Sequence, residues 1–415
     1  MCGITGFFRP RDAAPLRETE RRALRAMNDA IVHRGPDEDG FYEGDGVGLA
    51  MRRLSIIDVA GSQQPQFGSS GKTVCVYNGE VYNYRRVREE LEGLGHTFRT
   101  HGDTEIIPHG YEQWGIEGLL ERLNGMFAFA LYDATTRQLF LARDRMGIKP
   151  LYVRSFDGTW VFGSELKAVL PHPSVKRDVD VGALARYLTL EYVPSPRSIY
   201  KDIGKLEPAH YLRIDPDGTS STHRYWDLHF TASRDDWNHP EVPLPKPGRN
   251  TYTDWSQPFL HCLRESVRGR LVSEVPIGAL LSGGVDSSAI SALMSELVPD
   301  LRTFSIGFDE QSFDESHHAR AVATHIGSRH TARTFRGDMF GETLDQVRGF
   351  LDEPSADASI LSPHFLSKTV KEEGVTVVLS GDGADELFAG YPTYYAQQVA
   401  EKIKGVPGSG RLFRA

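Results

Sequence analysis

A cysteine stands second in the chain, in the sequence Met1-Cys2-Gly3-Ile4. Removal of Met1 would place a thiol and a free α-amine on the same residue. The thiolate is the nucleophilic form of cysteine, and an α-amine that titrates at about pH 8 can accept the thiol proton without a histidine partner. We therefore predict that Cys2 is an N-terminal nucleophile.

Groups suited to amide chemistry follow along the first half of the chain. Attack on a carboxamide produces an oxyanion, and the side chain of Asn78 with the backbone N–H of Gly79 forms a suitable pair of donors. Arg53 can hold a carboxylate bidentately, and Asp103 can hold an ammonium group. Each also has a simple structural explanation: Asn78-Gly79 could be a hairpin turn, Arg53 could pair with Asp58 at the surface, and Asp103 could cap a helix.

A glycine-rich segment in the second half reads LSGGVDSS, residues 281–288. It lies where an expected strand ends and an expected helix begins. Glycines let the backbone approach an anion, while backbone amides, the helix dipole and three serine hydroxyls point toward it. The segment lacks the Gly-Lys-Ser/Thr that holds a phosphate for γ-transfer, and Asp286 adds a carboxylate suited to Mg²⁺. We predict a phosphate-binding loop.

A second loop, LSGDGADE at residues 379–386, also follows a β-run. Two glycines and three carboxylates at the carboxyl end of a strand are typical of metal and nucleotide contacts at the edge of a parallel sheet. Taken alone, the segment could be a solvated turn. Its pairing with the first loop favours a nucleotide site.

The whole chain limits the classes of protein to consider. Its 415 residues are 40% hydrophobic and 25% charged, with a formal net charge of −9. This acidic balance argues against nucleic acid or an anionic membrane as the main partner. No run reaches the roughly 18 apolar residues of a membrane span, and no signal sequence is seen. We expect a cytoplasmic protein.

The cysteines and histidines point to no further metal centre. The three cysteines, Cys2, Cys75 and Cys262, form no CxxC pair, which argues against a disulfide framework or a structural zinc site. The adjacent His317 and His318 are expected on a solvated helix face. Magnesium associated with nucleotide is the one metal that the sequence indicates.

Short strand-like runs dominate the chain to about residue 170, at 46–51, 73–77, 127–132 and 138–142. Helical patterns lie between them at 84–94 and 106–114. Strands in pairs with helices grouped apart predict an α+β sandwich. Repeated prolines from 194 to 248 indicate a connecting segment.

Strands and helices then alternate. Strand-like runs at 277–281, 303–306 and 375–379 are accompanied by helical patterns that begin at about 287 and extend over 314–326 and 362–373. Buried apolar strands that alternate with helices predict an α/β doubly wound parallel sheet.

Together these motifs resemble the glutamine-hydrolysing asparagine synthetases, in which a class II glutaminase precedes an ATP pyrophosphatase domain. The similarity extends over nearly the whole chain. The segments that carry it are Cys2-Gly3-Ile4, His33-Arg34-Gly35-Pro36-Asp37, Arg53-Leu54-Ser55, Asn78-Gly79-Glu80 with Tyr82-Asn83, Gly102-Asp103-Thr104-Glu105, Ser282 to Ser288 and Ser380 to Glu386.

For the first half, the resemblance implies a four-layer αββα fold of the N-terminal nucleophile hydrolase type. Cys2 would be the nucleophile, Asn78 and Gly79 the oxyanion hole, and Arg53, Glu80 and Asp103 the residues that hold glutamine. The ammonia released there would pass through an internal tunnel to a second site. We place this glutaminase domain at residues 1–195 and the connecting segment at 196–250.

For residues 251–415, the resemblance implies an ATP pyrophosphatase domain. ATP and Mg²⁺ would adenylate the side chain of aspartate, and ammonia would then displace AMP to give asparagine. The implied metal contacts are Asp286 and Asp385, and the implied nucleotide contacts are Leu281, Ser282, Gly283, Gly284, Asp286, Ser287, Ser288, Ile306, Ser380, Gly381 and Asp382. A homodimer is one assembly compatible with this family.

The sequence departs from the family in length, because family members usually continue well past the LSGDGADE loop. We therefore expect an incomplete second domain. Three alternatives stay open: the same mechanism with another carboxylate acceptor, contacted around residues 352–360; glutaminase activity alone; and a non-catalytic fragment that binds a partner.

Overall fold

The structure is a computed structural model that describes residues 1–228, 244, 252–312 and 314–404. The chain divides into two compact units, each treated separately below. The first unit comprises Met1–His261, Val272–Val275 and Leu344–Leu361. The second comprises Cys262–Leu271, Pro276–Thr343 and Ser362–Ala415.

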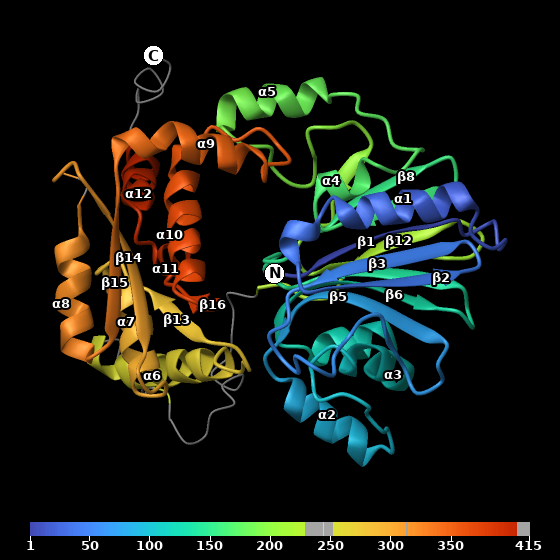
Figure 1. Ribbon diagram of the computed structural model, residues 1–415, viewed down its shortest axis with the longest axis horizontal. Coiled ribbons are helices and arrows are strands. Elements are labelled where there is room, and N and C mark those ends of the chain that lie inside the picture. The colour runs from blue at the N-terminus through green and yellow to red at the C-terminus, as the bar shows by residue number, and fades with distance from the viewer. Residues whose placement is uncertain (229–243, 245–251, 313, 405–415) are drawn as a thin grey trace. The chain divides into compact units, whose positions relative to one another are not determined.

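As far as it is described, the first unit contains two six-stranded antiparallel sheets (Figure 1). The first sheet has the order β10-β8-β9-β1-β3-β2. Its strands are β1 (Gly3–Phe8), β2 (Glu38–Gly44), β3 (Val47–Arg53), β8 (Tyr152–Phe156), β9 (Thr159–Gly163) and β10 (Ile203–Lys205).

The second sheet has the order β12-β11-β7-β6-β5-β4. Its strands are β4 (Gln66–Phe67), β5 (Thr73–Val81), β6 (Gly125–Asp133), β7 (Gln138–Arg143), β11 (His210–Ile214) and β12 (Ser220–Arg224).

Helices cover the outer face of each sheet. Helices α1 (Glu18–Asp29), α4 (Leu166–Val169) and α5 (Val181–Leu190) contribute to the core against the first sheet. Helices α2 (Tyr84–Gly93) and α3 (Ile106–Arg122) pack against the second sheet (Figure 1). A third core lies between the two sheets. These layers confirm the predicted αββα sandwich.

Strand β6 shows how the sequence builds two cores at once. Its large residues Phe127, Phe129 and Leu131 lie in the core shared with α2 and α3, whereas Ala128 and Ala130 lie in the core between the sheets. Because side chains alternate along a strand, a strand buried on both faces appears as an unbroken apolar run. The small alanines allow the two sheets to approach closely.

The described part of the second unit contains a four-stranded parallel sheet with the order β15-β14-β13-β16. Its strands are β13 (Ile277–Leu280), β14 (Arg302–Phe308), β15 (Arg329–Phe335) and β16 (Val377–Leu379). The helices are α6 (Tyr252–Gly269), α7 (Val285–Ser295), α8 (Ser316–Ile326), α9 (Phe340–Arg348), α10 (Leu361–Glu372), α11 (Ala384–Phe388) and α12 (Pro392–Lys404). Two of these helices are shared: the first turns of α6 and the later turns of α9 belong to the first unit.

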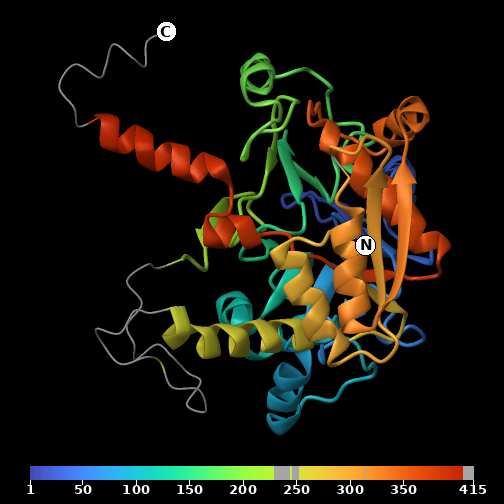
Figure 2. The same ribbon diagram turned by 90° about the vertical axis from the view of Figure 1, so that its left-hand side faces the viewer.

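Helices cover both faces of this sheet. Helices α7 and α8 pack on the face that carries Ala279 and Leu281, and α10 packs on the face that carries Leu280 and Phe304. Figures 1 and 2 show α8 along β14 and β15. The predicted doubly wound parallel sheet is confirmed, with helices within two residues of the predicted starts.

The compact units differ from the boundaries that we expected. Residues 203–224, which we placed in the connecting segment 196–250, form β10, β11 and β12 and complete the two sheets of the first unit. Prolines in this region flank the strands and do not interrupt them. The later part of the expected connecting segment, 229–250, lies outside the described residues except for residue 244. Residues 344–361, expected in the second half, pack with the first unit.

Within the described residues, no helix combines the length and the apolar character that crossing a membrane requires.

Candidate active sites

Cys2 lies at the start of β1, where the chain enters the first sheet. Gly3 pairs with Arg52 of β3, so Cys2 comes next to the residues that follow that strand. The Leu54 N–H donates to the Cys2 Sγ at 3.4 Å, and the Sγ lies 3.6 Å from the Leu54 carbonyl oxygen. The thiol therefore has a fixed position between the two sheets.

A small cavity of about 20 Å³ opens beside this thiol. Five of the predicted residues line it: Cys2, Arg53, Gly79, Glu80 and Asp103. They come from segments up to a hundred positions apart in sequence. The structure thus brings five of the six expected amide-handling groups to one place, whereas Asn78 is not among the lining residues.

Asn78 and Gly79 lie inside strand β5, not in a hairpin turn. Val74 and Val76 of β5 belong to the core between the sheets, so alternation directs Asn78 and Glu80 toward the same layer. Gly79 pairs with Phe127, and a Cβ at this position would lie 2.3 Å from the Met126 carbonyl oxygen. Glycine is therefore required here by close approach of β6.

The side chain of Asn78 is 1% exposed, and neither its oxygen nor its nitrogen has a hydrogen-bond partner. A buried amide without partners costs free energy, so such a group calls for an explanation. An amide N–H₂ that waits for a substrate oxygen is the arrangement that an oxyanion hole needs.

Arg53 is buried and fixes the segment that follows β3. Its guanidinium donates to the Glu38 carboxylate at 2.9 Å and to the Asp58 carbonyl oxygen at 2.8 Å. It also donates to the carbonyl oxygens of Ile57 and Val59. Arg53 lies on the cavity wall, and it also braces the surrounding loop.

Asp103 is buried and accepts hydrogen bonds from the Tyr77 hydroxyl and the Val81 N–H, both at 2.9 Å. Burial raises the pKa of the Asp103 carboxyl despite these bonds. Burial, and then the charge of Asp103, raise the pKa of Glu80 well above its ordinary value. Two neighbouring carboxyls in the wall of one cavity form a site for a cationic group.

Burial also raises the pKa of the Cys2 thiol, which favours the protonated form at neutral pH. Burial lowers the pKa of the Met1 α-amine to about 6. The amine is therefore mainly neutral at pH 7 and able to accept a proton. Lys149, only 3% exposed, places a further positive group beside this end of the chain, and burial lowers its pKa.

Sequence reasoning missed three contributors to this site. Tyr77 orients Asp103, Gln64 exchanges hydrogen bonds with the Tyr77 backbone, and Lys149 lies near the N-terminus. A tyrosine directly before Asn78-Gly79 was a usable signal. Gln64 and Lys149 had none, because they lie in connecting segments that only the folded chain brings to this site.

Arg34, in the HRGPD motif, holds the backbone of Cys2 in place. Its Nε donates to the Cys2 carbonyl oxygen at 2.8 Å, and its Nη1 donates to Glu165 at 2.7 Å. His33 also lies 3.0 Å from the Glu165 carboxylate. The motif therefore positions the Cys2 backbone through Arg34, which Glu165 holds in place.

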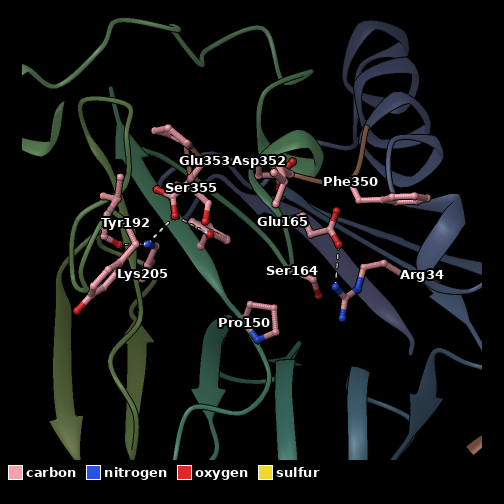
Figure 3. Close-up of a pocket in the computed structure, with 14 residues that line it drawn as sticks. Arg34, Pro150, Ser164, Glu165, Tyr192, Lys205, Phe350, Asp352, Glu353 and Ser355 are labelled. Atoms are coloured by element: carbon pink, nitrogen blue, oxygen red, sulfur yellow. Dashed lines mark hydrogen bonds and ion pairs between the residues drawn. The ribbon is translucent and has the colours of Figure 1, made fainter. Parts of the chain in front are cut away.

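A second cavity of about 360 Å³ lies in the first unit beside this ion pair (Figure 3). Figure 3 shows Glu165 directed at Arg34, and Glu353 directed at Lys205. The wall of this second cavity includes residues 350–355, which overlap the region expected to contact an acceptor. The Glu353 carboxylate also accepts from the Tyr152 hydroxyl and the Ile199 N–H. Glu353 is thus held by the first unit.

We predict that Glu80→Gln makes the protein more stable at neutral pH. The folded state keeps a proton on Glu80 that the unfolded chain releases above pH 4.5, so the free energy of unfolding falls as pH rises until the folded carboxyl has ionised. Glutamine has no carboxyl to ionise, so the variant lacks this decrease in the free energy of unfolding. Urea unfolding of the parent and the variant between pH 4.5 and 8 measures the difference.

Glu165→Gln is a control with the opposite expected effect. Burial opposes ionisation of Glu165, but the hydrogen bond and the charge of Arg34 lower its pKa. That variant should lose stability at pH values above the ordinary glutamate range and approach the parent as pH falls. Parallel pH profiles for the parent and Glu80→Gln would contradict the interpretation.

In the second unit, residues 281–284 join β13 to α7, at the strand-to-helix junction where we predicted a phosphate-binding loop. The Ser282 N–H donates to the Ser287 Oγ at 3.2 Å, and the Gly284 N–H donates to the Ser282 Oγ at 3.3 Å. Gly283 has φ +90°, and a Cβ there would lie 2.5 Å from the Ala319 nitrogen. The loop is preorganised by its own serines and its fit against α8.

Ser288 Oγ is buried and has no hydrogen-bond partner. It lies in the first turn of α7, whose N–H groups and dipole favour an anion. An unpaired hydroxyl at this place fits a phosphate group. Leu281 differs, because its side chain packs with Ala319 and Ala323 in the core and can offer only backbone.

The second loop lies directly against the first. Strands β13 and β16 pair with Ala279 opposite Leu379, so both loops leave the same edge of the sheet. A Cβ on Gly381 would lie 2.8 Å from the Ser287 nitrogen and 3.0 Å from the Asp286 Cβ. Ser380 donates to Asp382 at 2.7 Å within the loop.

Ile306 and Asp385 are partly exposed, on β14 and in the first turn of α11. Among the described residues, no group of three or more histidine, cysteine, aspartate or glutamate side chains is arranged to hold a metal ion. Mg²⁺ in nucleotide sites commonly uses one or two carboxylates together with the phosphates. Asp286 and Asp385 suit that mode.

We predict that Gly283→Ala destabilises the second unit by roughly 1–3 kcal/mol, because a left-handed backbone and a steric clash with α8 both oppose the added methyl. Gly327→Ala is the matched control, with φ +68° and nothing within 4 Å of the new Cβ. Urea unfolding should show the larger loss for Gly283→Ala. Equal losses would show that strain alone, and not contact with α8, fixes this loop.

Comparison with known proteins divides the chain in a similar way. Residues 1–226 match the family "Glutamine amidotransferase domain", and residues 259–413 match the family "Asparagine synthase". A curated glutamine-hydrolysing asparagine synthetase of Bacillus subtilis (strain 168) is 36% identical over 407 residues, which cover 98% of this chain and 61% of the relative.

Other relatives are similar over as much of the chain. A putative glutamine-hydrolysing asparagine synthetase of Mycobacterium bovis is 38% identical over 95% of this chain and 61% of its own length. One of Methanocaldococcus jannaschii is 32% identical over 98% of this chain and 79% of its own length. The chain therefore spans 61% of the length of the first two relatives.

Proposed function

Because the chain belongs to the family of glutamine-hydrolysing asparagine synthetases, we propose that it moves the amide nitrogen of glutamine to the side chain of aspartate at the expense of ATP. The products would be glutamate, asparagine, AMP and pyrophosphate. The observation that carries the first half of this proposal is the unpartnered, buried Asn78 amide, which directly precedes Gly79 of the Cys2 cavity wall.

In the first step the Cys2 thiol attacks the side-chain carbonyl carbon of glutamine. The α-amine that becomes part of Cys2 when Met1 is removed takes the thiol proton and later gives a proton to the leaving ammonia. The Asn78 side chain and the Gly79 N–H stabilise the oxyanion. Water then hydrolyses the thioester and releases glutamate.

The two ends of glutamine meet groups of opposite charge. Arg53 supplies the positive charge for the α-carboxylate, and the Glu80 and Asp103 carboxyls receive the α-ammonium. The raised pKa of both carboxyls supports this assignment, because a bound ammonium would compensate the repulsion between them.

The loops of the second unit hold ATP. Ser282, Gly283, Gly284, Ser287 and Ser288 surround the departing pyrophosphate, with the unpaired Ser288 hydroxyl as a donor. Leu281 and Ile306 border the nucleotide, and Ser380, Gly381 and Asp382 close the site from the second loop. Asp286 and Asp385 would hold Mg²⁺, which would neutralise charge on the phosphates.

Aspartate attacks the α-phosphate of ATP through its side-chain carboxylate, and pyrophosphate leaves. Ammonia then attacks the activated carbonyl and AMP leaves, which gives asparagine. Activation is needed because a carboxylate is a poor acceptor, and a closed passage is needed because ammonia would protonate and escape in water. A cytoplasmic location suits the reduced thiol.

One assay tests this proposal and its alternatives. The 415-residue protein is incubated with glutamine, aspartate and Mg-ATP, and glutamate, asparagine, AMP and pyrophosphate are followed together. Equal amounts of asparagine and AMP support the synthetase. Glutamate alone supports glutaminase activity only, and AMP formed only with another carboxylate identifies a different acceptor. Sedimentation of the same sample tests the expected homodimer.

A further inference from the structure

Two histidines and a serine converge on one point of the first unit, away from the Cys2 cavity. The Nδ1 atoms of His96 and His109 are 3.2 Å apart. The Ser69 Oγ lies 3.1 Å from the first and 3.0 Å from the second. These three atoms form a nearly equilateral triangle contributed by the β4–β5 turn, the α2–α3 connection and helix α3.

The outer ring nitrogens of both histidines face oxygen atoms. His109 Nε2 faces the Glu105 carboxylate at 3.5 Å, and His96 Nε2 lies 3.0 Å from the Gln113 Oε1. Oxygen acceptors at both Nε2 atoms favour the tautomer that carries its proton there. In that tautomer each Nδ1 presents a lone pair to the same point.

The Ser69 hydroxyl can donate only one proton to these two nitrogens. In that tautomer the other Nδ1, 3.2 Å from the first, is left without a donor among these three groups. A cation above the plane of the triangle, about 2 Å from each corner, would satisfy all three atoms at once.

The dimensions suit a tetrahedral metal ion. Zn²⁺ binds imidazole nitrogen at roughly 2.0–2.1 Å, which places neighbouring tetrahedral ligands about 3.3 Å apart. The three observed separations fall short of this spacing by a few tenths of an ångström. Metal-bound histidines commonly donate their other N–H to a carboxylate or an amide oxygen, as His109 and His96 do here.

Surroundings and access also agree with a metal site. The ring of Phe98 stacks on His109 at 4.6 Å between centroids and forms an apolar wall. Ser69 is exposed, so an ion can enter from solvent and keep a water as its fourth ligand. We propose that His96 Nδ1, His109 Nδ1 and Ser69 Oγ bind Zn²⁺.

The consequence is a clamp on the segment that carries Asp103. His96 and His109 flank residues 97–108, and Ser69 belongs to the turn that leads into β5. A bound ion would tie these three segments together. The site stands independently of the proposed function, since it uses no residue of the Cys2 cavity.

The test is a Zn²⁺ titration of metal-free Cys2→Ala protein without an affinity tag, in which the competing N-terminal thiol is absent. Calorimetry should detect a site that His96→Gln weakens at least about tenfold, and Gln113→Ala should weaken it by about the same factor through the outer ring nitrogen. The unfolding temperature should rise by about 5 °C when free Zn²⁺ is about 100 times the dissociation constant.

His317→Gln is the matched control, because it removes one of two adjacent, exposed histidines whose rings lie 3.9 Å apart. It should leave the affinity and the temperature rise unchanged. His96 is only half-buried, so His96→Gln is expected to fold, which circular dichroism checks. Equal Zn²⁺ affinity in the parent and His96→Gln, or the loss of binding in His317→Gln, would overturn the proposal.

Discussion

Cys2→Ala is expected to reduce glutamine hydrolysis at least about 1,000-fold, because the thiol is the only group in the proposed mechanism that forms a bond to the substrate. Glutamate release from glutamine measures this loss. ATP consumption with aspartate and ammonium chloride should continue, since ammonia then bypasses the first site.

Cys262→Ala provides the control for loss of a thiol. Cys262 is exposed and lies on α6, so its removal should leave both rates unchanged. Substantial glutaminase activity in Cys2→Ala would show that another nucleophile operates. Loss of both activities in Cys2→Ala would instead indicate that the substitution disturbs the fold.

Asn78→Ala is expected to lower kcat for glutamine hydrolysis by about 10²–10³-fold with little change in KM, because an oxyanion donor acts mainly in the transition state. Stability should not fall. The parent amide is buried without a partner, so its removal takes away an unsatisfied polar group. Steady-state kinetics and urea unfolding on the same preparation give both values.

Asn83→Ala separates this effect from the loss of any asparagine. The Asn83 side chain donates to the Arg122 carbonyl oxygen at 2.8 Å and accepts from the Asn124 N–H at 2.9 Å, so it joins structural segments. We expect it to lower stability and to leave kcat within a few-fold of the parent. The reverse pattern would remove Asn78 from the oxyanion hole.

The two predictions together test whether the cavity is a preorganised catalytic site. Cys2 is held by the Leu54 N–H and by Arg34 through its backbone oxygen, and Asn78 is held only by the packing of β5 between neighbouring strands. The protein keeps an unpaired amide at this position at a cost in stability. Preorganised dipoles of this kind need no rearrangement when charge develops.

Residues 344–361 show how the two halves of the sequence become connected. Glu353 pairs with Lys205 and Asp352 pairs with Lys167, so this segment of the second half is held by ion pairs to the first unit. Burial raises the pKa of Asp352 although Lys167 opposes it. The acceptor contacts expected around residues 352–360 therefore begin on a segment fixed by the first unit.

The sequence by itself determined most of the strands and helices and the chemistry of the loops at their ends. The apolar runs of β5, β6 and β13 predicted strands because side-chain alternation is a local property of the backbone. The loops at 281–288 and 379–386 could be recognised because their glycines and serines are contiguous. Cys2 could be recognised because a nucleophile and its base were expected on one residue.

Only the tertiary structure decided which of these groups meet. Pairing of β5 with β6 put Asn78 and Gly79 inside a sheet where the sequence also allowed a turn, and the same pairing left the Asn78 amide without a partner. The convergence of His96 with His109 likewise depends on the packing of α2 and α3 on one sheet. Such contacts join residues far apart in the chain, and local sequence patterns contain no information about which distant side chain will fill a given space.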